Sequence, residues 1–315
     1  MTRPVVALLD GIPSVEHARR RLPGVEVRKD LDRLRLADVT AVVSGPHTRL
    51  EPATLDSLVA LKVVAGTSAG YDHLPLAELR QRGVWVTAAR DYCVDEVADH
   101  TLALVVDLLR QVSTHNDALH AGGWRLGRQR RPPRRIAGTA LGLVGFGRTG
   151  RAVAQRAVAL GMAVSAFAPT AADADLADRD VGRAASLHDL LAASDVVSLH
   201  VPLSTRTRGL IDEAALAAMR PGAMLVNVAR GEIVDEPALT AALASGRLAG
   251  AALDVFAEEP LPAGHPLRSA PGAVLTPHIA WWSESAVRRG GDAALDAVAA
   301  VLRGERPAGA VVAAA

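Results

Sequence analysis

Three side chains of different chemistry follow three short apolar runs in the C-terminal half of the sequence. Arg230 follows "AMLVNVA", Glu258 and Glu259 follow "AGAALDVF", and His278 lies in "AVLTPHIA". An arginine grips a carboxylate with two parallel N–H groups. A carboxylate can hold an imidazole and favour its protonated form. With a hydride carrier, this set fits the interconversion of an alcohol and a ketone, with His278 exchanging the proton.

Each of these residues also has a simpler interpretation. A single histidine among apolar neighbours is more often a packed core residue with one satisfied hydrogen bond than an acid. Polar residues at the ends of three strands need not act together. An ordinary core histidine, however, has no reason to share a sheet edge with both an arginine and a carboxylate, so the placement of the strands decides between the interpretations.

Short apolar runs alternate with longer helical patterns along almost the whole chain. The runs, such as "VVALL", "AVVSG" and "LGLVG", lack the polar alternation of a half-exposed strand. They indicate parallel strands that are buried on both faces. We therefore predict an α/β protein with doubly wound parallel sheets. Because ligands of such sheets bind beyond the carboxyl ends of the strands, Arg230, Glu259 and His278 should reach one common edge.

The stretch "LGLVGFGRTGRAVAQRAVALGM" carries a glycine pattern between an expected strand and an expected helix. Gly145, Gly147 and Gly150 have the spacing that permits a tight turn, close approach of a pyrophosphate and close packing of helix on strand. Amide groups at the start of the helix suit an anion. A structural glycine turn is the alternative, but this setting favours dinucleotide binding, with Arg148 and Thr149 in the same turn.

The composition excludes several classes of function. Of the 315 residues half are apolar, and the formal net charge of +1 gives no overall field for nucleic acid or an anionic membrane. Cys93 is the single cysteine, so the chain cannot form an intramolecular disulfide or a thiolate metal cluster, and we predict no metal site. A short N-terminal apolar run, and no apolar segment of about 18 residues, predict a cytoplasmic protein without a membrane span.

The length suggests about two domains. One long helix is expected from Asp95 to about Ala121, because apolar residues recur at spacings of four and three. It would lead the chain into a second sheet. We predict a flavodoxin-like substrate-binding domain of residues 1–97 plus 285–315, and a Rossmann-type dinucleotide-binding domain of residues 98–284 inserted in it. Six arginines between residues 125 and 135 are expected on an exposed crossing segment, with anion binding as the alternative.

These motifs resemble the D-isomer-specific 2-hydroxyacid dehydrogenase family over nearly the full chain. The resemblance rests on "GFGRTG", "LVNVARGEIVDEPAL", "GAALDVFAEEPLP" and "TPHIA", which occur in this order. It implies that Arg230 binds the substrate, that Glu259 pairs with the histidine, and that His278 is the general acid/base. Glu259 is preferred to Glu258 because the family's glutamate lies five residues after the strand aspartate, which is Asp254 here.

The same resemblance implies an activity and further positions. The activity is interconversion of a 2-keto acid and an (R)-2-hydroxy acid by hydride transfer with NAD or NADP. Asp254 is similar to the aspartate that contacts the nicotinamide carboxamide, and the segment of Ser68, Ala69 and Gly70 matches the loop whose backbone amides hold the substrate carboxylate. The family also implies a homodimer formed through the cofactor domains.

Two positions depart from the family's pattern. Ser68 stands where the family usually has glycine, and Ala168 takes the place of the acidic residue that binds the adenosine ribose of NAD. The choice between NAD and NADP is therefore undecided at this point. Trp281, three residues after His278, is expected to line the pocket for the substrate side chain, with packing as its alternative role.

Within the family, two stretches look most similar to the C-terminal-binding-protein branch and its bacterial relatives, "DYCVDEVADHTLAL" and "TPHIAWWSESA". That likeness implies an alternative function, a dinucleotide-sensing interaction protein that keeps the dehydrogenase fold. The sequence has no obvious peptide-recognition extension and retains all three catalytic residue types. The dehydrogenase is therefore the leading interpretation.

Overall fold

The computed structural model of the chain divides into two compact units. One unit is made of Met1–Cys93 with Trp282–Ala315, and the other of Val94–Trp281. The residues that the structure describes are 3–9, 12–29, 31, 35–46, 48–124 and 132–312. Most of the predicted arginine-rich crossing segment, residues 125–131, lies outside the described residues. Each unit is described by itself below.

The unit Val94–Trp281 is built on a seven-stranded parallel sheet with the strand order β8-β7-β6-β9-β10-β11-β12. Counted along the chain from β6, this is the order 3-2-1-4-5-6-7, which extends the Rossmann arrangement by one edge strand. In sheets of this kind a ligand binds where the strand order reverses, which is between β6 and β9 here. The strands are β6 (Ala140–Val144), β7 (Ala163–Phe167), β8 (Gly182–Arg183), β9 (Val196–Leu199), β10 (Met224–Asn227), β11 (Gly250–Leu253) and β12 (Ala273–Leu275).

Helices cover both faces of this sheet, so consecutive strand residues enter different cores. Val196 belongs to the apolar cluster that contains side chains of α4 and α6, and Val197 belongs to the cluster that contains those of α8, α9 and α10. Burial on both faces explains why the strands lack polar alternation. The helices are α4 (Val94–Arg110), α5 (Val112–His120), α6 (Arg148–Ala159), α7 (Asp173–Ala177), α8 (Leu187–Ala193), α9 (Glu213–Ala218), η2 (Gly231–Ile233), α10 (Glu236–Ala244) and η3 (Pro266–Ser269).

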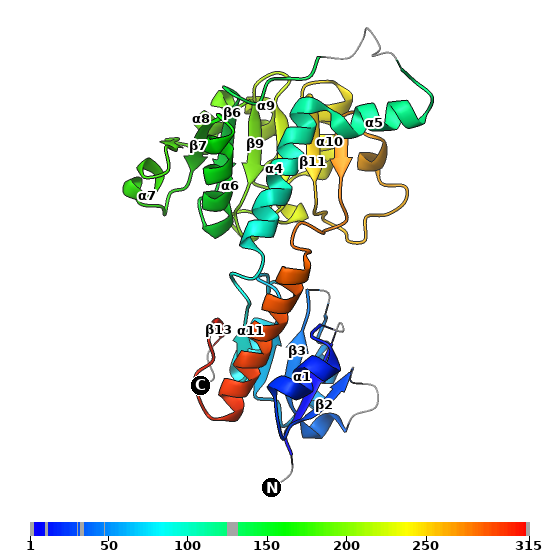
Figure 1. Cartoon of the computed structure of the whole chain (residues 1–315), viewed down its shortest axis with the longest axis vertical. Helices are drawn as coiled ribbons and strands as arrows, with labels where there is room; N and C mark the ends of the chain where they lie inside the picture. Colours follow the sequence, from blue (N-terminus) through cyan, green and yellow to red (C-terminus); the bar gives the residue numbers. More distant parts are fainter. Residues whose placement is uncertain are drawn as a thin grey trace. The chain divides into compact units, whose positions relative to one another are not determined.

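The single long helix predicted from Asp95 to about Ala121 is wrong. The chain forms α4 and α5 instead, and Gln111 between them has a left-handed backbone with φ of 57°. The Asp107 carboxylate accepts a hydrogen bond from the Ser113 backbone N–H at 2.8 Å and another from its hydroxyl. This contact satisfies the first turn of a new helix. Figure 1 shows α5 turning away from the direction of α4.

The other unit contains a six-stranded sheet in the order β13-β5-β4-β3-β1-β2, in which β13 alone is antiparallel. Its parallel strands have the flavodoxin-like order 2-1-3-4-5. Helix α11 packs on β3 and β4. The elements are β1 (Val5–Leu8), α1 (Val15–Arg21), β2 (Glu26–Lys29), η1 (Leu36–Asp38), β3 (Val39–Ser44), α2 (Pro52–Ser57), β4 (Val63–Gly66), α3 (Leu76–Gln81), β5 (Trp85–Thr87), α11 (Glu284–Leu302) and β13 (Ala310–Val312).

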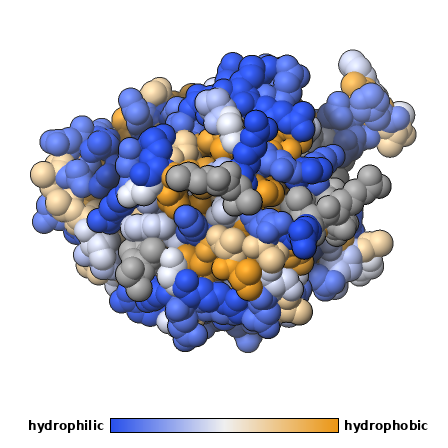
Figure 2. Space-filling view, turned by 90° about the horizontal axis from the view of Figure 1, so that it is seen from below, coloured by the Kyte–Doolittle hydropathy of each residue, from blue (hydrophilic) through white to orange (hydrophobic). Residues whose placement is uncertain are grey.

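These two sheets confirm the predicted fold class, an α/β protein with doubly wound parallel sheets of Rossmann-type and flavodoxin-like order. Hydrophilic residues cover most of the surface visible in Figure 2, and hydrophobic residues occur there in separate patches. Within the described part of the chain, no helix is both long and apolar enough to cross a membrane.

Candidate active site

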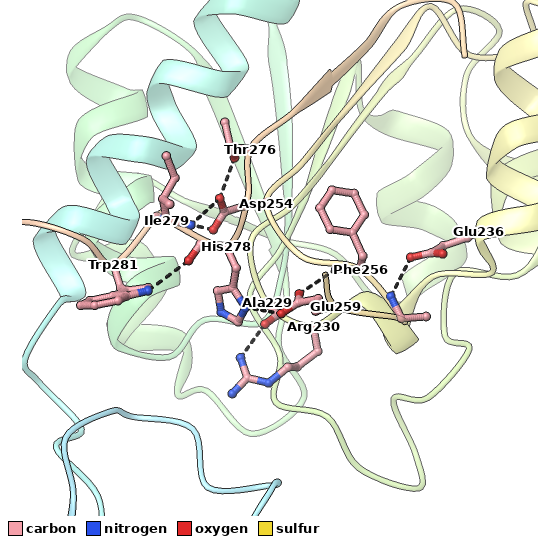
Figure 3. Close-up of polar contacts among 12 residues, drawn as sticks. Ala229, Arg230, Glu236, Asp254, Phe256, Glu259, Thr276, His278, Ile279 and Trp281 are labelled. Atoms are coloured by element: carbon pink, nitrogen blue, oxygen red, sulfur yellow. Dashed lines mark hydrogen bonds and ion pairs between the residues drawn. The ribbon is translucent and has the colours of Figure 1, made fainter. Parts of the chain in front are cut away.

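A buried carboxylate at the end of β11 organises the loop that carries the histidine. Asp254 directly follows β11 and is fully buried. Its two oxygens accept hydrogen bonds from the Thr276 hydroxyl at 2.6 Å and from the backbone N–H groups of Ile279 and Ala280 at 2.9 Å each. An uncompensated buried charge costs about several kcal/mol, so these donors tie the loop firmly to the strand. Figure 3 shows the arrangement.

The backbone of His278 is held in a left-handed conformation, with φ of 53°. This region costs a residue with a side chain about 1–2 kcal/mol. Two hydrogen bonds hold it there: the His278 backbone N–H donates to the Asp254 carbonyl at 2.8 Å, and the Trp281 indole N–H donates to the His278 carbonyl at 3.0 Å. The direction of the imidazole is therefore set by its neighbours rather than by local preference.

The imidazole of His278 meets the carboxylate of Glu259. Nδ1 lies 2.7 Å from Oε2, while Oε1 accepts a hydrogen bond from the Phe256 backbone N–H at 2.9 Å (Figure 3). Burial alone raises the pKa of Glu259, but the hydrogen bond and charge of His278, the Phe256 amide and the charge of Arg230 together hold that pKa below its ordinary value. Glu259 is thus ionised near neutral pH, so its Oε2 accepts the hydrogen bond from Nδ1 of His278.

Arg230 approaches the same edge from β10. The Asn227 side chain at the end of β10 accepts from the Ala229 backbone N–H at 3.0 Å and donates to the Arg230 carbonyl at 2.8 Å. The guanidinium Nη1 donates to the Ala229 carbonyl at 2.7 Å. Because β10, β11 and β12 are parallel neighbours, Arg230, Glu259 and His278 follow three adjacent strands at their carboxyl ends. The charge of Arg230 reaches Glu259, as the lowered pKa of that carboxyl indicates.

The glycine turn after β6 has the shape required for a dinucleotide. Gly145 has φ of 99°, and a Cβ there would lie 2.6 Å from the carbonyl oxygen of His200, while a Cβ on Gly150 would lie 2.6 Å from that of Gly145. Gly147 faces open space and is the N-cap of α6, without a side-chain capping hydrogen bond. The first amides of α6 therefore suit the pyrophosphate of a bound dinucleotide. Arg148 is exposed and Thr149 is half-buried in this turn.

His200, which directly follows β9, packs with its backbone carbonyl against Gly145 of the turn. His200 is only partly exposed, and burial lowers the pKa of His200 to about 4. Nε2 lies 2.9 Å from the Ser198 hydroxyl. The ring is therefore neutral near pH 7, so an anion at the turn would be held by backbone amides rather than by this histidine.

Two arginines lie near Ala168, at the end of β7. Arg183 donates to the Ala168 carbonyl at 3.1 Å and forms an ion pair with Asp173. Arg151, in the first turns of α6, pairs with Asp175 at 2.7 Å. Each of these two arginines is therefore paired with an aspartate. No sequence pattern pointed to Arg183, because its two-residue strand is too short to recognise.

The predicted carboxylate-binding loop lies in the other unit. Ser68 is buried, and its hydroxyl donates to the Gly70 carbonyl at 2.9 Å. The Ser68 carbonyl accepts from the Ala89 backbone N–H at 2.9 Å. Ala69 is exposed at the tip of the loop. The hydroxyl that departs from the family's glycine thus bonds within the loop, which shows how the loop accommodates it.

One further side chain, which the sequence pattern had not marked, contacts the Asp254 cluster. His100 on α4 has Nε2 at 3.1 Å from the Thr276 hydroxyl and 3.7 Å from Asp254. A polar side chain beside the apolar stripe of a helix is a signal that could have identified it. In the described ranges, no group of three or more His, Cys, Asp or Glu side chains is arranged to hold a metal ion.

Comparison with known proteins relates this arrangement to one family. The family model "D-isomer specific 2-hydroxyacid dehydrogenase, NAD binding domain" matches residues 102–280. The (S)-sulfolactate dehydrogenase of Chromohalobacter salexigens is 42% identical over 253 residues, which cover 79% of this chain and 81% of that protein. The matched residues include strands β6 to β12, and the glycine turn after β6 has the geometry expected of an NAD-binding domain.

Two solved structures are similar over almost the whole chain. The D-lactate dehydrogenase from Aquifex aeolicus, complexed with NAD and lactic acid, is 27% identical with a TM-score of 0.85, and the match covers 95% of this chain and 96% of that one. The NADPH-dependent glyoxylate/hydroxypyruvate reductase from Sinorhizobium meliloti is 29% identical with a TM-score of 0.87, and the match covers 98% of each. These relatives support the dehydrogenase over the interaction-protein alternative.

The likeness to the C-terminal-binding-protein branch stays a prediction, because the similarities reach only the level of the whole family. At that level they are decisive. The family model matches more than half of the chain, and a relative at 42% identity spans four fifths of it. The chain belongs to the D-isomer specific 2-hydroxyacid dehydrogenase family.

Proposed function

We propose that His278, Glu259 and Arg230 carry the reaction of this oxidoreductase, the interconversion of a 2-keto acid and an (R)-2-hydroxy acid with NAD or NADP. Membership of the family gives the class of reaction and the nicotinamide cofactor. The observation that supports the residue roles most strongly is the 2.7 Å contact between His278 and the ionised Glu259. The pair lies at the sheet edge where the glycine turn also opens.

In the reducing direction His278, as imidazolium, protonates the carbonyl oxygen of the substrate. Nδ1 donates to Glu259, so Nε2 is the nitrogen that exchanges the proton. General acid catalysis of this kind contributes about 10² to 10⁴ in rate. The planar fork of Arg230 binds the substrate carboxylate and orients the keto group. The nicotinamide nucleotide, when bound, supplies the hydride.

The (R) configuration follows from the family rather than from a contact. The relative's name contains (S)-sulfolactate. A sulfomethyl group outranks a carboxyl group in the priority rules for descriptors, whereas a methyl group does not. The (S) descriptor of sulfolactate and the (R) descriptor of lactate therefore denote the same handedness.

The family does not fix the side chain of the substrate. Assays with a panel of 2-keto acids that carry apolar, hydroxylated and anionic side chains would identify it.

His278→Ala is expected to abolish reduction of every 2-keto acid that the unmodified enzyme accepts, because it removes the proton donor. The dissociation constants of NADH and NADPH should stay within about threefold, since their proposed contacts lie at the glycine turn, at Ala168 and at Asp254, none of which is substituted. Initial rates and fluorescence titrations measure the two effects. His188→Ala, at an exposed position on α8, is the control. Substantial turnover by His278→Ala would contradict the proposed role.

Arg230→Lys is expected to lower kcat/KM by at least about a hundredfold, because lysine keeps the charge but loses the two-point fork. Steady-state kinetics with the best substrate of the panel measure the change. Arg303→Lys, in which the parent side chain is well exposed, controls for loss of a surface guanidinium. An Arg230→Lys enzyme with full efficiency would rule out the proposed carboxylate clamp.

The dissociation constants for NADH and NADPH are expected to lie within about tenfold, or about 1.4 kcal/mol. Ala168 neither binds the ribose diol nor repels a 2′-phosphate, and the nearby Arg183 and Arg151 are balanced by Asp173 and Asp175. Titration of both nucleotides at one ionic strength tests this, and a hundredfold preference for either would contradict it. The substitution Arg183→Gln should raise the dissociation constant of NADPH more than that of NADH.

We also propose a cytoplasmic homodimer formed through the unit Val94–Trp281. Helix α5 has no buried residue, and Val112 and Leu119 are 60% and 55% exposed in the single chain. A partner would cover them. Sedimentation velocity at micromolar concentration should give a dimer, and Leu119→Glu should weaken it while Val59→Glu, exposed on the other unit, should not. A stable monomer of the unmodified chain would reject the proposal.

A further inference from the structure

A second pairing of a carboxylate with an imidazole lies behind the His278–Glu259 pair. Glu236, the first residue of α10, is only 8% exposed. Its Oε1 accepts a hydrogen bond from the Ala257 backbone N–H at 2.8 Å, and its Oε2 lies 3.3 Å from Nε2 of His265. A buried carboxylate needs such donors. The family resemblance assigned no role to either residue, and the mechanism above does not use them.

The hydrogen bonds of His265 determine which ring nitrogen carries the proton. His265 is the N-cap of η3, and its Nδ1 accepts from the Leu267 backbone N–H at 3.3 Å. A nitrogen that accepts a hydrogen bond carries no proton, so the proton of a neutral ring is on Nε2 and points to Glu236. Oε1 of Glu236 therefore has the Ala257 N–H as its donor, and Oε2 faces Nε2 of His265 at 3.3 Å.

Consecutive amides of one loop bind the two glutamates. The Phe256 backbone N–H donates to Glu259, which faces His278, and the Ala257 backbone N–H donates to Glu236, which faces His265. Figure 3 shows the two contacts on either side of the loop. Gly231 fixes the loop from a third side, because a Cβ there would lie 1.9 Å from the carbonyl carbon of Phe256.

We propose that Glu236 and His265 are positioning residues that hold the loop of residues 256–259 so that the Glu259 carboxylate meets His278. This inference rests on the proposed roles of Glu259 and His278. A loop anchored only by Gly231 and by its own chain could shift along the sheet edge, and a displacement of about 1 Å in a catalytic group costs about a hundredfold in rate. Substrate and nucleotide do not need Glu236 for binding in this arrangement, so the effect falls on kcat.

Glu236→Gln tests the pairing with almost no change of shape. The introduced amide can keep its oxygen on the Ala257 N–H, but its NH₂ group then faces the N–H of His265. His265 cannot reverse its tautomer without placing a second N–H against that of Leu267. We expect kcat to fall by about 10- to 100-fold, with KM and the nucleotide dissociation constants within about threefold.

His265→Asn is the second variant. Its side-chain oxygen can still accept from Leu267 and cap η3, because asparagine is a good N-cap residue, but its amide is too short to replace the contact with Glu236. We expect the same selective fall in kcat. In the double variant the two losses should not add, because both substitutions break one interaction.

Asp235→Ala is the matched control for general damage to α10. Asp235 is the N-cap of the same helix and accepts from the Ala238 backbone N–H at 3.0 Å. Loss of this cap should lower the melting temperature by about 2–4 °C, while kcat stays within about twofold of that of the unmodified enzyme. Glu236→Gln or His265→Asn with full kcat, or a fall that only follows the melting temperature as in Asp235→Ala, would overturn the inference. An active His278→Ala enzyme would instead overturn the proposed function.

Discussion

The buried negative charge of Asp254 is the constraint on which the geometry of the active site depends. The side chain is inaccessible to water, so its two oxygens need hydrogen-bond donors from the protein. The three nearest donors come from one short segment, the Thr276 hydroxyl and the amides of Ile279 and Ala280. That segment must therefore curl around the carboxylate. The left-handed backbone of His278 is the consequence, since it lies between the donors.

The same principle recurs along the edge of the sheet, where polar side chains bind backbone amides of the neighbouring loops. The side-chain oxygens of Asn227, Glu259 and Glu236 accept hydrogen bonds from backbone N–H groups. The donors are Ala229, Phe256 and Ala257, in that order. An amide is present at nearly every residue, so these contacts fix the path of the loops without constraining the side chains that the loops carry. The reactive groups can then be rigid although no regular helix or strand contains them. Such rigidity suits a reaction in which proton and hydride must reach adjacent atoms.

The sequence predicted the sheets well because burial on both faces removes polar alternation from the strands. It predicted the glycine turn because a Cβ on Gly145 or Gly150 would lie too close to a backbone carbonyl oxygen. It failed at Gln111, where the Asp107 side chain ends one helix and starts another. Such a polar contact leaves the apolar spacing unchanged. Arg183 and His265 could not be found, because their partners lie on other elements that only the fold brings near. The roles of Arg230, Glu259 and His278 stay predictions that the geometry supports.

The balance of charges around Glu259 gives Arg230 an effect besides its proposed role in substrate binding. Burial raises the pKa of this carboxyl, and the proton-bearing ring of His278 is the strongest influence that lowers it. In the proposed reaction His278 gives its proton to the substrate, and that influence then weakens. The Phe256 amide and the charge of Arg230 remain, and both still favour the carboxylate. Arg230 thus helps to keep Glu259 ionised in the half of the cycle in which the imidazole is neutral. In the proposed reaction an ionised Glu259 then keeps its hydrogen bond to Nδ1 of His278, which leaves Nε2 as the nitrogen that takes up the next proton.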